Sequence, residues 1–164
     1  MEKNKSVETA IFSGGCFWGV ESSFRKVRGV TSTESGYIGG HTEDPTYEEV
    51  CTDATGHAEA VRVKFNPDEV SYEELARLFF EIHDPTQVDR QGADIGSQYR
   101  SEIFYTSPRQ RETAEMLIEA LRRRGYMVVT RLTRAPKFHR AEEYHQNYSE
   151  KTGRNVCAPH VKRF

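Results

Sequence analysis

The feature that most constrains the fold is a β-strand that changes directly into a helix at Gly14-Gly15-Cys16-Phe17-Trp18-Gly19. Residues 9–13 alternate and are rich in β-branched and aromatic side chains, whereas residues 20–27 carry apolar side chains at helical spacing. This junction predicts a chain that mixes strands and helices, with Cys16 in the first turn of the helix. Because the free N–H groups and the dipole of that turn favour a negative charge, we expect the pKa of the Cys16 thiol to be lowered.

Two aromatic residues, Phe17 and the only tryptophan, Trp18, lie beside this thiol in a chain of mean hydropathy -0.75. An aromatic pair next to a reactive thiol is typical of a pocket wall. The alternative is structural, because most lone cysteines behave as small buried hydrophobic residues and most Phe-Trp pairs belong to a core. From these residues alone, both interpretations stay open.

Length and charge limit the class of protein. The 164 residues suit a single domain, 1–164, with a substantial core. Since 23 Lys and Arg residues are balanced by 25 Asp and Glu residues, net charge offers no attraction to nucleic acid or to an anionic membrane. Residues 1–8 lack the apolar run of a signal peptide, and no segment reaches the ~20 apolar residues of a membrane span. We therefore expect a cytoplasmic protein without nucleic-acid or membrane partners, and we take it to be a monomer.

Short-range patterns predict the other strands and helices. Runs rich in β-branched and aromatic residues predict strands at 9–13, 31–38, 58–65, 101–105 and 126–132. Ser71 and Glu74 form a capping-box pattern that starts one helix, and Ser107 starts a second helix that ends at Gly125. Together these elements predict an α/β (α+β) sandwich around one main sheet.

Three segments lack such patterns. Residues 39–56 and 84–100 are long and aperiodic, which in a compact domain is typical of functional loops. They contain Tyr47, Asp94 and Tyr99. The tail 151–164 has few apolar residues, so we expect it to be mobile and to carry Cys157 with it.

Glu59 is the second chemical clue. In the strand predicted at 58–65, strict alternation places Glu59 on the same face as Val61, Val63 and Phe65. A carboxyl on that apolar face is desolvated, which raises its pKa and lets it act as an acid near neutral pH. The alternative is that Glu59 lies at a frayed strand end or pairs with an arginine.

Seven segments, in the same order as in a known family, run across nearly the whole chain. They are Gly14-Gly15-Cys16-Phe17-Trp18-Gly19, Gly36-Tyr37-Ile38-Gly39-Gly40, Tyr47-Glu48-Glu49-Val50, Thr55-Gly56-His57-Ala58-Glu59-Ala60-Val61, Asp89-Arg90-Gln91-Gly92, Gly96-Ser97-Gln98-Tyr99-Arg100-Ser101 and Glu143-Tyr144-His145-Gln146. On these segments the chain resembles the class A methionine sulfoxide reductases, which reduce peptide-methionine (S)-S-oxide. Ala93 and Ser97 depart from the usual asparagine and threonine, which are small changes. The resemblance implies a two-layer α/β roll around one mixed sheet, with long coil segments and a coiled C-terminal tail.

The resemblance also implies roles for the site residues. Cys16 would be the nucleophile that attacks sulfur and becomes a sulfenic acid. Phe17 and Trp18 would hold the methyl group of the substrate. The sulfoxide oxygen would be bound by Tyr47, Glu59 and Tyr99, with Asp94 lining the same site. Hydroxyl donors and a neutral carboxylic acid suit an oxygen that must leave sulfur with a proton.

The resemblance also implies different roles for the three cysteines. By the same resemblance, Cys157 resolves the sulfenic acid as a disulfide with Cys16, and thioredoxin or another dithiol reopens it. No other cofactor is implied. The expected substrates are oxidised proteins and peptides that contain methionine sulfoxide, and free methionine sulfoxide as well. Cys51 follows Val50 in a short apolar turn, so we expect it to be buried and inert. His145 is expected to pack beneath the site.

Two other classes of protein remain to be compared with this interpretation. A cysteine hydrolase would need an imidazole base for Cys16, and His57, His83, His139, His145 or His160 could supply it. A zinc-binding interaction module could be built from Cys51, His57, Cys157 and His160. No local hydrolase signature supports any of these histidines as the base. The zinc module is not supported either, because the chain contains no CxxC and no paired Cys/His ligand spacing. We therefore expect no metal site.

Overall fold

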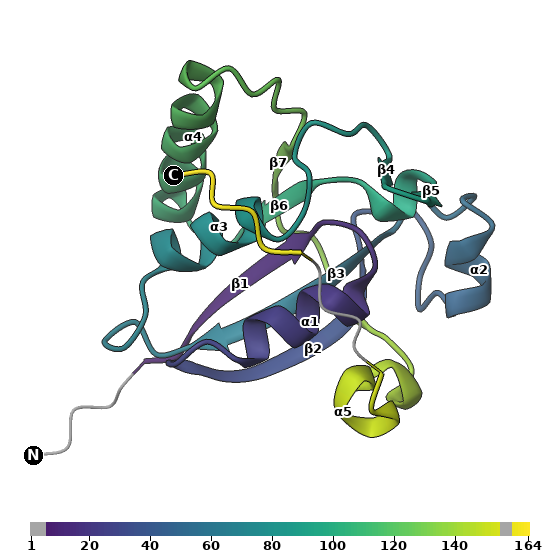
Figure 1. The fold of residues 1–164 in the computed structure, drawn as a ribbon. Coiled ribbons are helices and arrows are strands. Elements are labelled where there is room, and N and C mark those ends of the chain that lie inside the picture. The colour runs from purple at the N-terminus through teal and green to yellow at the C-terminus, as the bar shows by residue number, and fades with distance from the viewer. Residues whose placement is uncertain (1–5, 155–158) are drawn as a thin grey trace, which may run out of the picture.

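The computed structural model describes residues 6–154 and 159–164 and is built around one six-stranded sheet (Figure 1). The strand order is β7-β6-β1-β3-β2-β8, and neighbouring strands are antiparallel except for the parallel pair β6 and β7. The strands of this sheet are β1 (Glu8–Ser13), β2 (Val30–Ile38), β3 (Ala58–Phe65), β6 (Glu102–Tyr105), β7 (Arg131–Arg134) and β8 (His139–Arg140). A separate two-stranded ladder pairs β4 (Arg90–Gln91) with β5 (Asp94–Ile95). The single mixed sheet confirms the predicted fold class.

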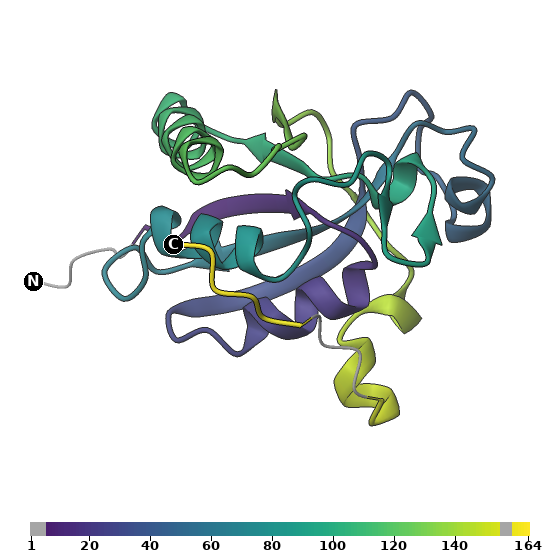
Figure 2. The ribbon, with the colours of Figure 1, turned by 45° about the horizontal axis from the view of Figure 1, so that its top comes forward.

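Helices cover one face of this sheet. The helical elements are α1 (Phe17–Arg25), α2 (Tyr47–Cys51), α3 (Tyr72–Glu81), α4 (Pro108–Arg123) and α5 (Tyr148–Thr152), with short 3-10 turns η1 (Ser97–Tyr99) and η2 (Glu143–His145). Phe12 and Val63 point toward α1, α3 and α4 and share their main core. Ile11 and Phe104 point to the opposite face, where Phe138 covers a smaller cluster. Figure 2 shows α1 and α3 over the same side of the sheet.

The predicted helix boundaries follow from their caps. Ser71 accepts a hydrogen bond from the backbone N–H of Glu74 at the start of α3. Ser107 caps α4 in the same way, with Pro108 in the first turn. Gly125 follows α4 with a φ of 95°, a left-handed conformation that glycine adopts without strain. Both helix predictions are therefore confirmed.

Two regions differ from the sequence predictions. The strand predicted at 126–132 pairs only from Arg131 onward, because the backbone N–H of Tyr126 returns to Leu121 and that of Val129 bonds to Pro85 instead of to a strand. The segment 39–56 contains α2, which a capping box between Thr46 and Glu49 starts. The segment 84–100 contains β4, β5 and η1. Short elements of this size are stabilised by tertiary contacts, and so they leave no periodic pattern.

The tail is the clearest correction. Residues 159–164 pack along α3 instead of lying free: the N–H of Val161 donates to the carbonyl of Glu81, and the N–H of Arg163 donates to the Glu81 carboxylate. Phe164 packs against Phe80. The end of the chain therefore has bonding partners that its weak apolar content did not predict, and Figure 2 shows it running beside α3. Cys157 lies outside the described residues. None of the helices in the described part of the chain has the length and apolar character needed to cross a membrane.

Candidate active site

Cys16 lies at the N-cap of α1, one position before the first turn. Two glycines bring the chain from β1 to this position. Gly15 has a φ of 93°, and a Cβ on Gly14 would lie 2.8 Å from the ring of Phe79 and 2.9 Å from the ring of His83. The strand can therefore turn into the helix here only because these two positions carry no side chain. The Cys16 side chain is half-buried.

The pKa of Cys16 shifts in the direction opposite to the sequence prediction. Burial is the main cause, and together with the nearby charges of Glu59 and Asp94 it raises the pKa of this thiol to about 12. The backbone N–H groups of Trp18 and Gly19 lower it, as the helix start predicts, but they are outweighed. The thiol is therefore protonated at neutral pH in this structure, and a reaction that needs the thiolate must first move that proton.

Glu59 is the group best placed to receive it. The side chain is 1% exposed, on the helix-facing side of β3, as strand alternation predicted. Oε1 accepts a hydrogen bond from the N–H of Phe17 at 3.3 Å, and Oε2 accepts one from Nε2 of Gln98 at 3.1 Å. Burial raises the pKa of Glu59 to about 7, although both donors act in the opposite direction. At neutral pH this carboxyl can therefore both take up and release a proton.

Two tyrosines and an aspartate surround the pair. Tyr47 is the first residue of α2 and Tyr99 the last of η1, and both are half-buried. Burial and the charge of Glu59 raise the pKa of each phenol, so both hydroxyls remain donors. Asp94, at the start of β5, raises the pKa of Cys16, of Glu59 and of Tyr99. The structure thus brings together five of the residues that the sequence selected from distant segments.

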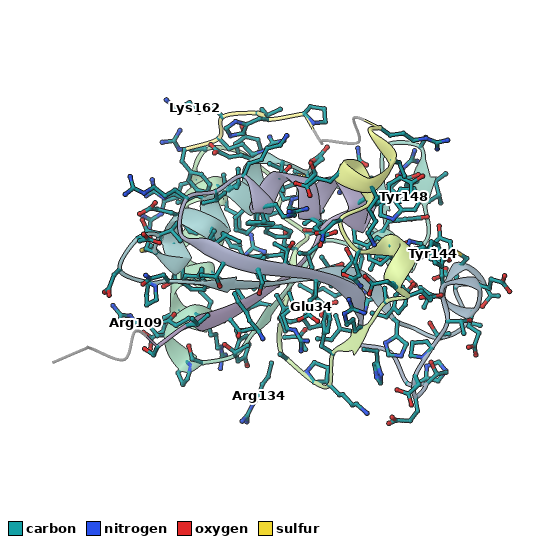
Figure 3. The ribbon with its side chains drawn as sticks, turned by 90° about the horizontal axis from the view of Figure 1, so that it is seen from below. Glu34, Arg109, Arg134, Tyr144, Tyr148 and Lys162 are labelled. Atoms are coloured by element: carbon teal, nitrogen blue, oxygen red, sulfur yellow. The ribbon has the colours of Figure 1, made fainter. Side chains whose placement is uncertain are left out.

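The aromatic pair beside the thiol has two different environments. Phe17 is completely buried and packs against Tyr47, with ring centroids 6.5 Å apart, and against His145 at 5.1 Å. Trp18 is half-buried, stacks on Tyr148 at 3.7 Å and donates a hydrogen bond from Nε1 to Nδ1 of His145 at 2.9 Å. Of these two aromatic side chains, only that of Trp18 is partly exposed, so it is the one that a substrate can contact. His145 packs under both rings, as the sequence predicted. Figure 3 shows Tyr148 at the upper right of the molecule and Lys162 of the tail at the upper left.

A cavity of about 400 Å³ opens on the other side of the thiol. Cys16 and Asp94 line it, together with Pro159, Val161 and Arg163 of the docked tail. The two tyrosines, Glu59 and the aromatic pair are not among its lining residues. Cys16 therefore lies between a polar cluster and a cavity that the C-terminal residues help to close.

Cys51 requires a correction. It is exposed instead of buried, because Val50 is the residue of α2 that faces the core and Cys51 is the next one. Its sulfur accepts a hydrogen bond from Nε2 of Gln98 at 3.6 Å and lies within hydrogen-bonding contact of the Tyr47 hydroxyl. Gln98 thus contacts both Cys51 and Glu59. The sequence analysis missed Gln98 as a site residue, and its place between Ser97 and Tyr99 in a shared segment was the only signal.

The histidines that a hydrolase would need are held by other groups. His57 bonds to the backbone of Gly40 and Thr42, and His83 bonds to Phe79 and Ser101. His145 accepts from Trp18, and His160 bonds to Glu81. The ring of His139 lies beside Asp44. Both ring nitrogens of His57 and of His83 are engaged in this way, whereas Nε2 of His145 and Nδ1 of His139 are buried without a hydrogen-bond partner.

The zinc-module alternative gains no support either. Within residues 6–154 and 159–164, one group of three potential ligands comes together, and it consists of Glu43, Asp44 and His139. It contains none of the residues proposed for such a module.

A half-buried thiol near a carboxyl whose pKa is about 7, with two phenol donors in the same cluster, defines a thiol-dependent enzyme that acts on a group with a basic oxygen. A family model described as "Peptide methionine sulfoxide reductase" matches residues 8–164. The chain belongs to this family.

Individual relatives agree over nearly their full length. The peptide methionine sulfoxide reductase MsrA of Acidobacterium capsulatum is 53% identical over 151 residues, which cover 90% of this chain and 97% of that protein. The MsrA of Geobacter sulfurreducens is 52% identical over 160 residues, covering 96% and 99%. Among solved structures, Mxr1 from Saccharomyces cerevisiae in reduced form superposes with a TM-score of 0.88 at 32% identity, covering 100% of this chain and 96% of that chain. The sheet order and helix arrangement described above are therefore those of the family.

Proposed function

We propose that this protein reduces methionine (S)-sulfoxide, in proteins and peptides and as the free amino acid, to methionine. The observation that carries the proposal is the placement of the Glu59 carboxyl, with a pKa raised to about 7, beside the thiol of Cys16. A sulfoxide needs a nucleophile at sulfur and a proton at oxygen in the same step. The names of the relatives support this substrate.

The first step follows from the two pKa values. Because Glu59 loses its proton before Cys16 does, the resting site at pH 8 holds one proton, on sulfur. Transfer of that proton to Glu59 produces a thiolate and a carboxylic acid without changing the net charge. The thiolate then attacks the sulfoxide sulfur while the acid protonates the oxygen. The S–O bond of the substrate then breaks and an S–O bond to Cys16 forms, so that methionine leaves and Cys16 becomes a sulfenic acid: the substrate sulfur is reduced by two electrons, the sulfur of Cys16 is oxidised by two, and Glu59 is left as the carboxylate.

Tyr47 and Tyr99 orient the substrate in this step. Their hydroxyls are kept protonated by burial and by Glu59, so both can donate to the sulfoxide oxygen. Trp18 offers the apolar surface for the methyl group. With the oxygen fixed on one side and the methyl group on the other, only one configuration at sulfur fits, and the resemblance assigns it as S.

The second half of the reaction involves Cys157. We propose that it condenses with the sulfenic acid to form a disulfide and water, and that a thioredoxin-class dithiol reduces this disulfide. Pro159, two residues after Cys157 in the sequence, lines the same cavity as Cys16. Mxr1 has been solved in complex with Trx2, and this motivates the choice of reductant. Protein repair in the cytoplasm after oxidative stress is the setting that we propose for this activity.

Two peptides, each with one sulfoxide epimer, test the proposal. We expect the reduced protein to convert the S peptide and leave the R peptide, with both peptide and enzyme followed by mass spectrometry. Cys16→Ser should release no methionine. Cys157→Ser should release about one methionine per enzyme and then stop when thioredoxin is the reductant. Equal rates on both epimers, or sustained thioredoxin-driven turnover by Cys157→Ser, would contradict the assignment.

A further inference from the structure

A second group of polar side chains lies where the segment that precedes α2 meets β8. The ligand atoms of Glu43, Asp44 and His139 all lie within 4.8 Å of one another. Glu43 and Asp44 are exposed, and their side chains are 81% and 87% accessible. An exposed acidic pair is common on protein surfaces, so these two residues alone would carry no conclusion.

His139 distinguishes this cluster from an ordinary acidic surface. Its side chain is only 7% exposed, and its Nδ1 is buried without a hydrogen-bond partner. That nitrogen faces the carboxylates, with Oδ1 of Asp44 at 3.5 Å, which is too long for a hydrogen bond. Since a buried polar atom without a partner costs free energy, something of opposite polarity is expected at this position.

We propose that Glu43, Asp44 and His139 form a binding site for a divalent transition-metal ion of the zinc class. One imidazole nitrogen and two carboxylate oxygens are a ligand set that such ions accept, whereas calcium and magnesium prefer oxygen ligands alone. Bonds of about 2.1 Å would require the carboxylates to move by roughly 1 Å, and both side chains are exposed enough to do so. A cavity of about 210 Å³ beside Asp44 and His139 leaves room for water to complete the coordination.

One cation already lies near the cluster. Nζ of Lys137 is 3.6 Å from Oε2 of Glu43, and both side chains are well exposed. An exposed ion pair of this length contributes little stability, so an arriving metal ion can displace it. Lys137 therefore weakens the site without blocking it.

The position of the site suggests a structural role. An ion there would join the segment before α2, which carries Tyr47, to the strand β8. Glu142, two residues after β8, already accepts a hydrogen bond from the N–H of Tyr47 at 2.9 Å. Metal binding would thus add a second restraint on the helix that carries one of the proposed substrate donors, without contact to the reacting atoms.

The test measures metal binding in an untagged full-length protein whose three cysteines are replaced, Cys16→Ser, Cys51→Ser and Cys157→Ser, because free thiols also bind zinc. Titration calorimetry with Zn²⁺ should give one ion per chain. Co²⁺ should give weak visible bands without the strong near-ultraviolet absorption of sulfur ligands. An equal concentration of Ca²⁺ should not compete.

Variants locate the ion. Asp44 has a φ of 41°, and asparagine tolerates that conformation equally well, so Asp44→Asn removes the charge without straining the backbone. Asp44→Asn and His139→Phe should each weaken Zn²⁺ binding at least tenfold. Asp89→Asn is the matched control, because Asp89 is another left-handed aspartate outside the cluster, and it should bind as before.

Three results would overturn the proposal: no binding at millimolar Zn²⁺, equal binding by the parent and by Asp44→Asn, or displacement of Zn²⁺ by an equal concentration of Ca²⁺. If His139→Phe fails to fold, Asp44→Asn still decides the outcome.

Discussion

Glu21 and Glu59 are both 1% exposed, and burial raises the pKa of both, yet their surroundings differ. Glu21, on α1, accepts hydrogen bonds from the hydroxyls of Thr33 and Ser35 and from the N–H of Asn147. These donors tie α1 to β2 and to the segment before α5. Glu59 has two donors, Phe17 and Gln98, and the other groups that influence it belong to the candidate site.

This difference shows that burial alone does not identify a catalytic acid. Glu21 is surrounded by fixed donors from β2 and from the segment before α5, which is the environment of a structural carboxylate. Glu59 lies next to the Cys16 thiol, whose pKa its charge raises. A carboxyl can exchange protons with a substrate only where such a partner faces it, so the neighbours of a buried carboxyl, rather than its exposure, distinguish the two roles.

The largest expected effect is a loss of single-turnover rate when Glu59, but not Glu21, is replaced by glutamine. Glu59→Gln keeps the size of the side chain but cannot transfer a proton, so we expect the single-turnover rate to fall by about 10²–10⁴. Sulfenic acid should still form slowly, because Tyr47 and Tyr99 polarise the oxygen. Single-turnover quench experiments are needed, since a slow disulfide step would hide the loss in steady state. An unchanged rate from pH 5 to 9 would show that Glu59 has only a structural role.

Glu21→Gln should lower the stability of the fold and leave the single-turnover rate nearly unchanged. One oxygen of the carboxylate becomes an NH₂ group that faces donors, so we expect a loss of about 1–3 kcal/mol in the free energy of unfolding. The single-turnover rate per folded molecule should stay within about twofold. Urea denaturation and active-site titration measure the two quantities separately. A loss of rate as large as that in Glu59→Gln would remove the distinction between the two carboxyls.

The smallest expected effect is a shift in the pKa of Glu59 when its side-chain donor, Gln98, is replaced. Gln98 stabilises the ionised form of this carboxyl, so Gln98→Leu should raise its pKa further. One hydrogen bond of about 1 kcal/mol corresponds to a change of roughly 0.7 pH units in the midpoint of the rate profile. Cys51→Ser is the matched control, because it changes the other partner of Gln98 and leaves the bond to Glu59 in place. A downward or absent shift in Gln98→Leu would contradict the role of this donor.

Local sequence patterns were sufficient to predict some features of this site, whereas other features depend on contacts between distant segments. Glu59 was predicted to be buried because strand alternation is strict, and Cys16 was located because a strand and a helix meet there. The pKa of Cys16 was predicted in the wrong direction, since it depends on burial and on the charge of Glu59, which comes from the strand β3. The docked tail depends on Glu81, and Gln98 reaches Glu59 through η1, so neither contact leaves a local pattern.

The central claim is that Cys16 and Glu59 share one proton in the reactive state, and the pH dependence of the single-turnover rate tests it most directly. Below pH 7 the site holds two protons, one too many for a thiolate beside a carboxylic acid. The rate of the wild-type protein should therefore rise about tenfold per pH unit up to about pH 7 and then level off, because the resting and reactive forms carry the same net charge. In Glu59→Gln this break near pH 7 should disappear. A wild-type rate that is highest at pH 5 and falls as the pH passes 7 would contradict the shared proton and would indicate a free thiolate with an independently protonated acid.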